Sequence, residues 1–107
     1  MTGGATLVAT FAALGDPTRW EVLTELGAGE ASASALANRM PVSRQAIAKH
    51  LAVLEEVGLV EAVRVGREVR YRALGSSLSS VARELDRVGA QWDRRLSLIR
   101  DIAEGRA

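Results

Sequence analysis

The chain of 107 residues has no cysteine and only one histidine. Without cysteine, the protein can form no disulfide bond, no thiolate nucleophile and no cysteine-ligated metal site. The single histidine, His50, has no second histidine or cysteine with which it could hold a transition metal. The sequence therefore predicts neither a bound metal nor a cofactor.

Long apolar runs are also absent. The apolar stretch within residues 1–14 is too short and too interrupted to cross a bilayer, and no basic leader precedes it. We therefore expect no membrane segment and a cytoplasmic location.

Neither sign of charge dominates. The chain carries 14 lysine and arginine residues against 13 aspartate and glutamate residues, which gives a formal net charge of +1. This balance is weak support for nucleic-acid binding, so such a function must rest on where the charges lie. The share of hydrophobic residues, 48%, is typical of a folded protein, and the length suits a single domain over residues 1–107.

The residue sets that carry catalysis are missing as well. The sequence has no nucleophile–base pair, no phosphate-binding glycine loop and no set of metal ligands. His50 has no partner that would make it a catalytic base. We predict that the protein is not an enzyme.

The sequence does contain a series of helix signals. Apolar residues at helical spacing predict a first helix over residues 6–14, after frayed residues 1–5. Asp16 can cap a second helix, and Pro17 suits the first position of that helix because its missing N–H costs nothing there. The residues expected to form the apolar face and the end of the second helix are Trp20, Val22, Leu23, Leu26, Gly27 and Gly29.

Two further helices meet across a tight turn. Ser32 or Ser34 can cap a short helix, which Pro41 stops. Ser43 caps a longer helix that runs to about residue 57. Two helices joined in this way are typical of a helix-turn-helix.

A β-hairpin and a last helix follow. Residues 59–65 and 69–74 are rich in β-branched residues, and residues 66–68 link them. A long helix over about residues 77–103 completes the chain. We therefore predict a mainly α protein with a small β-hairpin, a winged helix-turn-helix of five helices plus the wing.

The helix over residues 43–57 has a polar face suited to the major groove of DNA. In that groove arginine and lysine can pair with guanine, glutamine can pair with adenine, and alanine allows a close approach. The competing interpretation is a face that is polar only because it is solvated. The turn before this helix and the hairpin after it favour DNA. The apolar stripe comprises Ile47, Leu51 and Leu54, and the candidate DNA contacts are Ser43, Arg44, Gln45, Ala48, Lys49 and, to a phosphate, His50.

The wing, residues 59–74, carries four arginines. A basic hairpin can follow the DNA backbone or enter the minor groove, whose negative potential attracts guanidinium groups. The alternative is an edge hairpin whose charges only prevent aggregation, and the same side chains can serve both purposes. The candidate DNA contacts among them are Arg64, Arg67 and Arg70.

The last helix has more apolar surface than so small a domain can cover. Apolar residues from Leu78 to Trp92 are spaced 3, 4, 3 and 4 residues apart, as in paired helices. Folding back onto its own core is the alternative, but we favour a homodimer through the first and last helices. A twofold dimer would place two DNA-contacting helices about 34–36 Å apart, one turn of DNA. The candidate interface residues are Leu7, Phe11, Leu78, Val81, Leu85, Val88, Trp92 and Leu96.

These features resemble the ArsR family of bacterial winged-helix transcription regulators. The matching segments are FAALGDPTRWEVLTEL, SALANRMPVSRQAIAKHLAVLEEVGLVEAVRVGREVRYRAL and the last-helix string WDRRLSLI. The resemblance implies a dimer, usually a repressor, whose first and last helices form the interface. It also implies operator contacts from Arg44, Gln45, Ala48 and Lys49, and backbone contacts from the wing.

The chain departs from that family at the metal sites. Metal-sensing members carry a Cys-x-Cys pair in the short helix before the turn, where this chain has Ser32 and Ser34. Serine hydroxyls are poor ligands for thiophilic metals. The last helix also lacks a histidine for the family's other metal site. The chain therefore resembles the branch of the family that does not sense metals, and the sequence identifies no small-molecule effector.

The sequence thus predicts a sequence-specific DNA-binding transcriptional regulator. The expected form is a homodimeric repressor that binds an inverted-repeat operator in double-stranded DNA through the 43–57 helix and the 59–74 wing. The alternative is a winged-helix module that binds protein without operator binding, which the near-neutral net charge of +1 favours.

Overall fold

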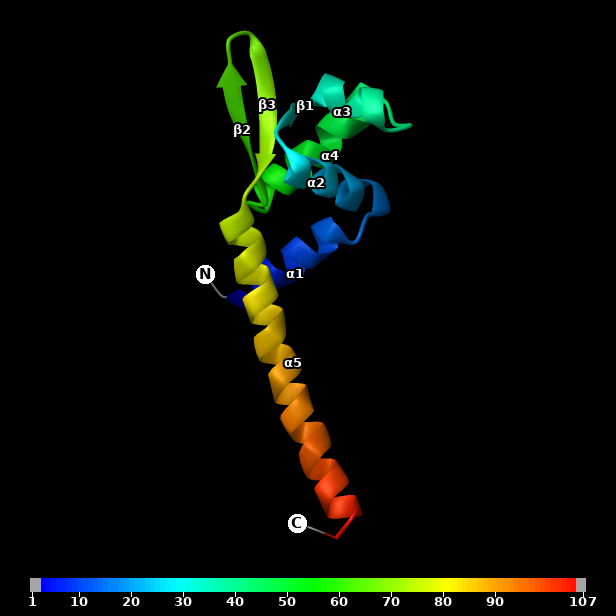
Figure 1. Cartoon of the computed structure of the whole chain (residues 1–107), viewed down its shortest axis with the longest axis vertical. Coiled ribbons are helices and arrows are strands. Elements are labelled where there is room, and N and C mark those ends of the chain that lie inside the picture. The colour runs from blue at the N-terminus through cyan, green and yellow to red at the C-terminus, as the bar shows by residue number, and fades with distance from the viewer. Residues whose placement is uncertain (1–2, 106–107) are drawn as a thin grey trace. The chain divides into compact units, whose positions relative to one another are not determined.

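The computed structural model describes residues 3–105 and has five helices and three strands in that range (Figure 1). It divides into two compact units, one ending at Ser77 and one beginning at Leu78. The five helices and the hairpin confirm the predicted mainly α class. The elements are α1 (Gly3–Leu14), α2 (Pro17–Ala28), β1 (Ala31–Ser32), α3 (Ala33–Arg39), α4 (Arg44–Glu56), β2 (Val60–Val65), β3 (Glu68–Ala73) and α5 (Gly75–Ala103).

The first helix is longer than expected. α1 begins at Gly3, so residues 3–5, which the sequence placed in a frayed segment, are helical. Residues 1 and 2 of that segment lie outside the described residues. At the end of α2, Gly27 is still helical, and Gly29 is the capping residue.

Side-chain caps set the beginnings of three helices. A side-chain oxygen of Asp16, Ser32 or Ser43 accepts a hydrogen bond from the backbone N–H three residues later, over 3.0–3.1 Å. Each cap satisfies one of the N–H groups that a helix leaves unpaired in its first turn. Of the two serines available for α3, Ser32 is the cap and Ser34 lies inside the helix.

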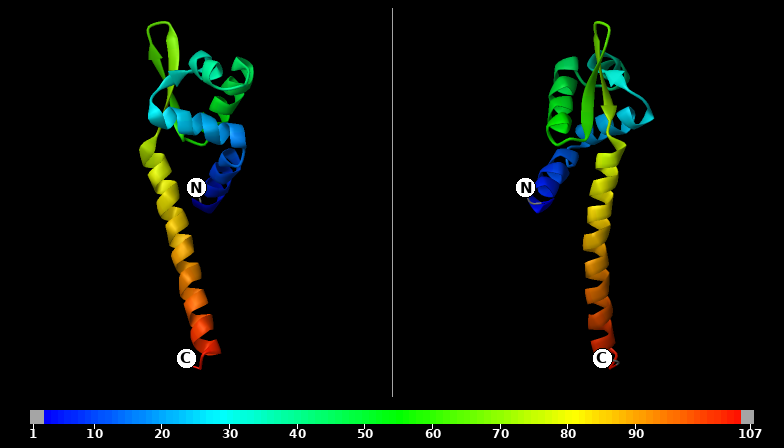
Figure 2. Two further views of the ribbon diagram at one scale, coloured as in Figure 1. Left: turned by 45° about the vertical axis from the view of Figure 1, so that its right-hand side comes forward. Right: turned by 90° about the vertical axis from the view of Figure 1, so that its left-hand side faces the viewer.

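The core of the first unit lies under the apolar stripe of α4. The exposed fraction of Ile47, Leu51 and Leu54 is 0%. The elements α2, α3 and β2 pack against α4, as the ribbons in Figure 2 show. Complete burial of a side chain of this size contributes roughly 1.5–3 kcal/mol. The other buried apolar residues are Ala13, Val22, Leu23, Leu26, Ala31, Leu36, Met40, Leu59 and Val60.

Trp20 does not join this core. Its exposed fraction is 56%, whereas Val22, Leu23 and Leu26 are buried. The prediction that Trp20 belongs to the apolar face of α2 is therefore wrong. At about 100° per residue, the three buried residues share one arc of the helix, and Trp20 lies roughly 110° from the centre of that arc.

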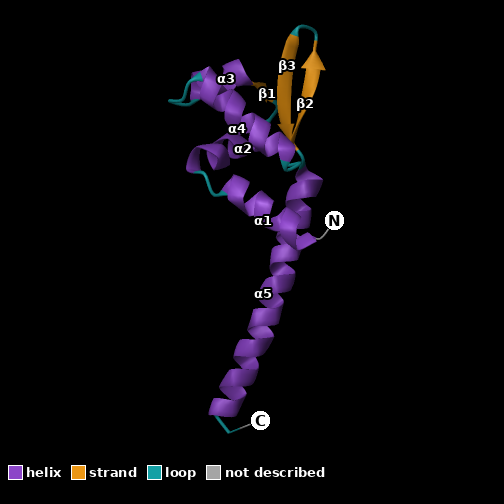
Figure 3. Ribbon diagram, turned by 180° about the vertical axis from the view of Figure 1, so that it is seen from behind, coloured by secondary structure: helices purple, strands orange, loops and turns teal. Residues whose placement is uncertain are grey.

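β2 and β3 form an antiparallel hairpin, seen from behind in Figure 3. Its last pair joins Val65 to Glu68, so the turn consists of Gly66 and Arg67 and is one residue shorter than predicted. Gly66 has a φ of +63°, a conformation that glycine adopts without strain. The turn places Arg67 at the tip of the hairpin.

A third strand, β1, was missed in the sequence. Its two residues pair with Tyr71 and Arg70 of β3, which gives the sheet order β1-β3-β2. Two residues are too few to show the alternation that marks a strand. Because α3 follows β1 directly, this short strand joins the start of the helix-turn-helix to the hairpin.

The second unit consists of α5 from Leu78 onward and the residues after it. None of the residues of α5, all of which the structure describes, is buried, and Leu85, Trp92 and Leu96 are 53–58% exposed. The Arg95 guanidinium lies 5.5 Å from the centroid of the Trp92 ring, a cation–π contact. No helix within residues 3–105 is long and apolar enough to cross a membrane.

The cap of α4 gives a testable prediction. Ser43→Ala removes the acceptor for the backbone N–H of Ala46, so we expect it to lower the free energy of unfolding by about 1 kcal/mol. Urea unfolding at one protein concentration measures the change. Ser79→Ala, on the exposed surface of α5, is the control and should change stability far less. Equal effects of the two substitutions would contradict the capping role.

Candidate nucleic-acid interface

α4 presents one polar face to solvent. Since Ile47 and the rest of its apolar stripe are enclosed, the rotation of the helix about its axis is determined. Arg44, Gln45, Ala48 and Lys49 are all exposed as a result. The structure therefore brings together on one surface the four residues that the sequence grouped as DNA contacts.

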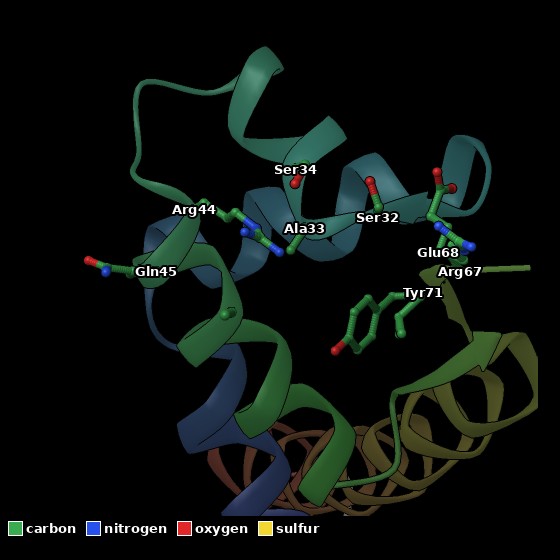
Figure 4. Close-up of a pocket in the computed structure, with 10 residues that line it drawn as sticks. Ser32, Ala33, Ser34, Arg44, Gln45, Arg67, Glu68 and Tyr71 are labelled. Carbon is green, nitrogen blue, oxygen red and sulfur yellow. The ribbon is translucent and has the colours of Figure 1, made fainter. Parts of the chain in front are cut away.

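A cleft of about 710 Å³ lies between α4 and the hairpin. We call it the α4–hairpin cleft. Its walls come from the first half of α4, from β1 with the start of α3, and from the hairpin (Figure 4). Among its lining residues are Arg44 on one wall, Arg67 and Tyr71 on the other, and Ser34 from α3.

Neighbouring side chains of α4 lie differently in this cleft. Arg44 and Gln45 both line the cleft, but in Figure 4 the Arg44 side chain extends across it towards Ala33, whereas the Gln45 side chain points in the opposite direction. The Tyr71 hydroxyl points towards α4. Neither Tyr71 nor Ser34 was among the residues predicted to contact DNA. Tyr71 follows Arg70 directly in the sequence, but side chains alternate along a strand, so the two residues face opposite sides of the hairpin. The folded structure was needed to show that the side with Tyr71 faces the cleft.

The cations of the first unit fall into two groups. Arg39 forms an ion pair with Glu25 at 3.8 Å, and Arg72 forms one with Glu61 across the hairpin. In contrast, four cations of α4 and the hairpin have neither a hydrogen bond nor an ion pair with any residue from 3 to 105. These four are Arg44, Lys49, Arg64 and Arg67.

Arg70 belongs to the paired group, although the sequence proposed it as a DNA contact. Its guanidinium donates to the carboxylates of Glu68 and of Glu30, the latter at 3.3 Å. The hydrogen bond to Glu68 is the main reason that the pKa of Arg70 is raised, and the bond to Glu30 adds to it. Arg70 therefore neutralises Glu68, a carboxylate that lines the cleft, and links the hairpin to the segment before β1.

His50 is half-buried on α4 and lies within electrostatic reach of Asp16. The pKa of Asp16 is lowered, chiefly by the hydrogen bond from the backbone N–H of Arg19. Partial burial opposes this shift, and the charges of His50 and Arg19 add to it. The predicted phosphate contact of His50 stays a prediction.

The predicted interface residues lie on α1 and α5. Phe11, Leu85, Trp92 and Leu96 are exposed. The remaining members are half-buried: Leu7, Leu78, Val81 and Val88.

The described residues hold no group of three or more histidine, aspartate and glutamate side chains that could bind a metal ion. Ser32 uses its hydroxyl to cap α3.

Two helices joined by a tight turn and followed by a basic hairpin define a winged helix-turn-helix protein. A family profile, HTH_20, described as a helix-turn-helix domain, matches residues 14–63. An ArsR-like transcriptional regulator from Rhodococcus sp. RHA1 superposes with a TM-score of 0.87 at 65% sequence identity, over 92% of this chain and 93% of that one. The chain therefore belongs to the ArsR family of winged helix-turn-helix transcriptional regulators, which confirms the resemblance drawn from its sequence.

Two further relatives are more distant. The HTH-type transcriptional regulator CmtR of Mycobacterium tuberculosis is 38% identical over 76 residues, which are 71% of this chain and 64% of CmtR. This chain thus spans less than two thirds of the length of that regulator. The homodimeric winged helix-turn-helix DNA-binding domain Mb0332 of Mycobacterium bovis is 28% identical, with a TM-score of 0.64, over 86% of this chain and 82% of that one. The first two of these three relatives are described as transcriptional regulators, a non-enzymatic kind of protein, and Mb0332 as a possible one.

The cap at Asp16 gives a prediction for acid stability. Because the pKa of this carboxyl is lowered in the folded protein, its charge stabilises the fold above its ordinary pKa of 3.8, and this contribution is lost as the pH falls through the folded value. Asp16→Asn keeps a capping oxygen but removes the titration. We expect a smaller loss of stability on acidification in the variant, measured by urea unfolding from about pH 6 to pH 2. Parallel acid profiles for variant and wild type would show that Asp16 makes no such contribution.

Proposed function

We propose that the protein is a sequence-specific DNA-binding transcriptional regulator, a homodimeric repressor of an inverted-repeat operator. The observation that carries this proposal is the distribution of free cations. In the described part of the first unit, the lysine and arginine side chains without a protein partner all lie on α4 and the hairpin. Unpaired cations on one surface attract a polyanion and release its counterions when it binds.

The proposed geometry assigns the two elements to different grooves. The exposed face of α4 enters the major groove, where Gln45 and Lys49 reach base edges and Ala48 allows a close approach. The hairpin lies along the backbone or in the adjacent minor groove. Arg70 must break its ion pairs with carboxylates to reach a phosphate, so we expect it to contribute less to the affinity for DNA than Arg64. The full proposed contact set is Ser43, Arg44, Gln45, Ala48, Lys49, His50, Arg64, Arg67 and Arg70.

The proposed dimer forms through α1 and α5. The uncovered apolar residues of α5 support it, because a helix of 29 residues with an apolar stripe and no buried residue has surface left for a partner. The proposed interface comprises Leu7, Phe11, Leu78, Val81, Leu85, Val88, Trp92 and Leu96. The homodimeric state of the Mycobacterium bovis relative also supports it. A regulator of this kind acts on chromosomal DNA, so the proposal includes a cytoplasmic location.

The test of DNA binding is the salt dependence of affinity for the DNA upstream of the protein's own gene. We expect affinity to fall steeply with salt. Arg64→Ala should weaken binding to every duplex and make the slope of log K against log [salt] shallower by about 0.9, because one phosphate is no longer neutralised. Fluorescence anisotropy at several salt concentrations measures both. The matched control is Arg39→Ala, since Arg39 is already paired with Glu25, and it should change neither.

A different result would favour the second candidate, a winged helix that binds protein. The net charge of +1 is the observation in its favour. If wild-type protein shows no salt-dependent affinity for any duplex, DNA binding is wrong and the exposed face of α4 must serve another partner.

The dimer gives a separate prediction. Leu85→Glu places a charge in the apolar stripe of α5, where a twofold partner would bring it into a desolvated interface. We expect this variant to sediment as a monomer at concentrations where the wild type is a dimer. Ser79→Glu, elsewhere on α5, is the matched control and should leave the dimer intact. Sedimentation velocity decides between them, and a dimeric Leu85→Glu protein would contradict the proposed interface.

A further inference from the structure

The α4–hairpin cleft lies where a DNA strand must pass, and this inference rests on the proposed function. If α4 occupies the major groove and the tip of the hairpin reaches the adjacent minor groove, the two elements lie on either side of one sugar–phosphate backbone. That backbone must then run between α4 and the hairpin. The cleft of about 710 Å³ is the space between these two elements.

We propose that the α4–hairpin cleft is a phosphodiester-binding site. It holds one DNA backbone between Arg44 of α4 and Arg67 of the hairpin, with the hydroxyls of Tyr71 and Ser34 as further donors. Arg44 thereby takes a role in holding the backbone and not in recognising bases.

The charges of the cleft are those of an anion site. Arg44 and Arg67 come from opposite walls, both are exposed, and neither has a hydrogen bond or an ion pair within residues 3–105. Guanidinium groups bind phosphate oxygens with paired, charge-assisted hydrogen bonds. Glu68 is the acidic residue among the described lining side chains, and Arg70 already holds its carboxylate. An entering phosphate therefore meets two free positive charges and a neutralised negative one.

Tyr71 supplies an uncharged hydrogen-bond donor from a backbone position that is paired on both sides. Its backbone lies in the central strand of the sheet, opposite Ala31 of β1 and Ala62 of β2. The side chain is half-buried, and its hydroxyl points towards α4 (Figure 4). This hydroxyl has no hydrogen-bond partner in the described part of the chain. A phenol held in this way can donate to a phosphate oxygen without giving up a bond to the protein.

Ser34, which lines the same cleft, also has a hydroxyl without a hydrogen-bond partner in the described residues. Ser34 is exposed in the first turn of α3, and its hydroxyl has no partner among residues 3–105. Ser32, its neighbour in the lining, instead uses its hydroxyl to accept the backbone N–H of Ala35. Ser34 can therefore turn its hydroxyl towards a bound phosphate without disturbing a helix cap.

The apolar part of the lining suits the deoxyribose groups of the DNA backbone. Ala33, Ala48 and Val69 also line the cleft, and Val69 is 39% exposed. Deoxyribose presents C–H groups on either side of each phosphate. A cleft that mixes free guanidinium groups with small apolar side chains matches this alternation better than it matches a flat base edge.

The proposal separates two adjacent residues of α4. Both residues line the cleft, but the Arg44 side chain extends across it towards Ala33, whereas the exposed Gln45 side chain points in the opposite direction (Figure 4). A residue that contacts phosphate contributes to the affinity for every sequence, whereas a residue that contacts a base edge contributes to discrimination. Arg44 and Gln45 should therefore have different substitution phenotypes although both lie on the exposed surface of one helix.

The experiment compares four variants of the full chain on two duplexes. One duplex is enriched from a random pool by the wild-type protein, and the other is its scrambled counterpart. Arg44→Ala and Arg67→Ala should each weaken binding to both duplexes about tenfold and lower the salt slope by about one, as expected when one cation no longer reaches a phosphate. Tyr71→Phe should weaken binding to both about threefold without changing the slope, since the hydroxyl is neutral. Gln45→Ala, the control, should weaken binding to the enriched duplex alone.

A modified backbone locates the phosphate that the cleft binds. Methylphosphonate replaces single phosphates of the enriched duplex by neutral groups, one position at a time. At one position we expect the affinity of the wild type to fall about tenfold and that of Arg44→Ala to fall hardly further, because this variant already lacks the interaction with that phosphate. Tyr71→Phe should be coupled to that same position.

The outcomes separate this inference from the proposed function. If the wild type binds DNA but Arg44→Ala relaxes sequence preference as Gln45→Ala does, or is coupled to no phosphate, the cleft is not a backbone site and the regulator proposal stands. If the wild type binds neither duplex with salt-dependent affinity, the proposed function fails and this inference fails with it. Circular dichroism of each variant confirms that the fold is retained.

Discussion

The burial of one apolar stripe on α4 is the constraint on which the rest of the site depends. Ile47, Leu51 and Leu54 are completely enclosed by neighbouring elements. A helix is rigid, so burial of one side determines the direction of the opposite side. The same packing that stabilises the first unit therefore holds the exposed face of α4 towards solvent, and loss of the core would remove the candidate interface together with the fold.

The short strand β1 connects this helix pair to the hairpin. It pairs with β3, and its last residue, Ser32, is also the cap of α3. The side chain of Arg70 also connects these segments, through ion pairs with Glu30, which precedes β1, and with Glu68 of the hairpin. Exposed ion pairs contribute little stability, so their main effect is on charge: they leave Arg67 at the tip as an uncompensated cation beside a neutralised Glu68.

Much of this fold was predictable because its signals are local. The caps at Asp16 and Ser43, the apolar spacing around Ile47 and the glycine turn of the hairpin each lie within a few residues, and each is confirmed. The two errors have different sources. Trp20 was placed on the apolar face of the second helix although the periodicity of α2 puts it off the buried arc, whereas β1 is too short to have a pattern.

The five helices, the hairpin and the exposed face of α4 could be predicted from the sequence, since helix periodicity and capping depend on near neighbours. Which cations are free depends instead on the tertiary structure. Arg70 is paired with Glu30, which is 40 residues away in the chain, and Arg72 is paired with Glu61 across the ladder. The tertiary structure also brings Tyr71, Ser34 and Arg44 together in one cleft. Contacts between distant residues follow from strand register and helix packing, and no local pattern contains them.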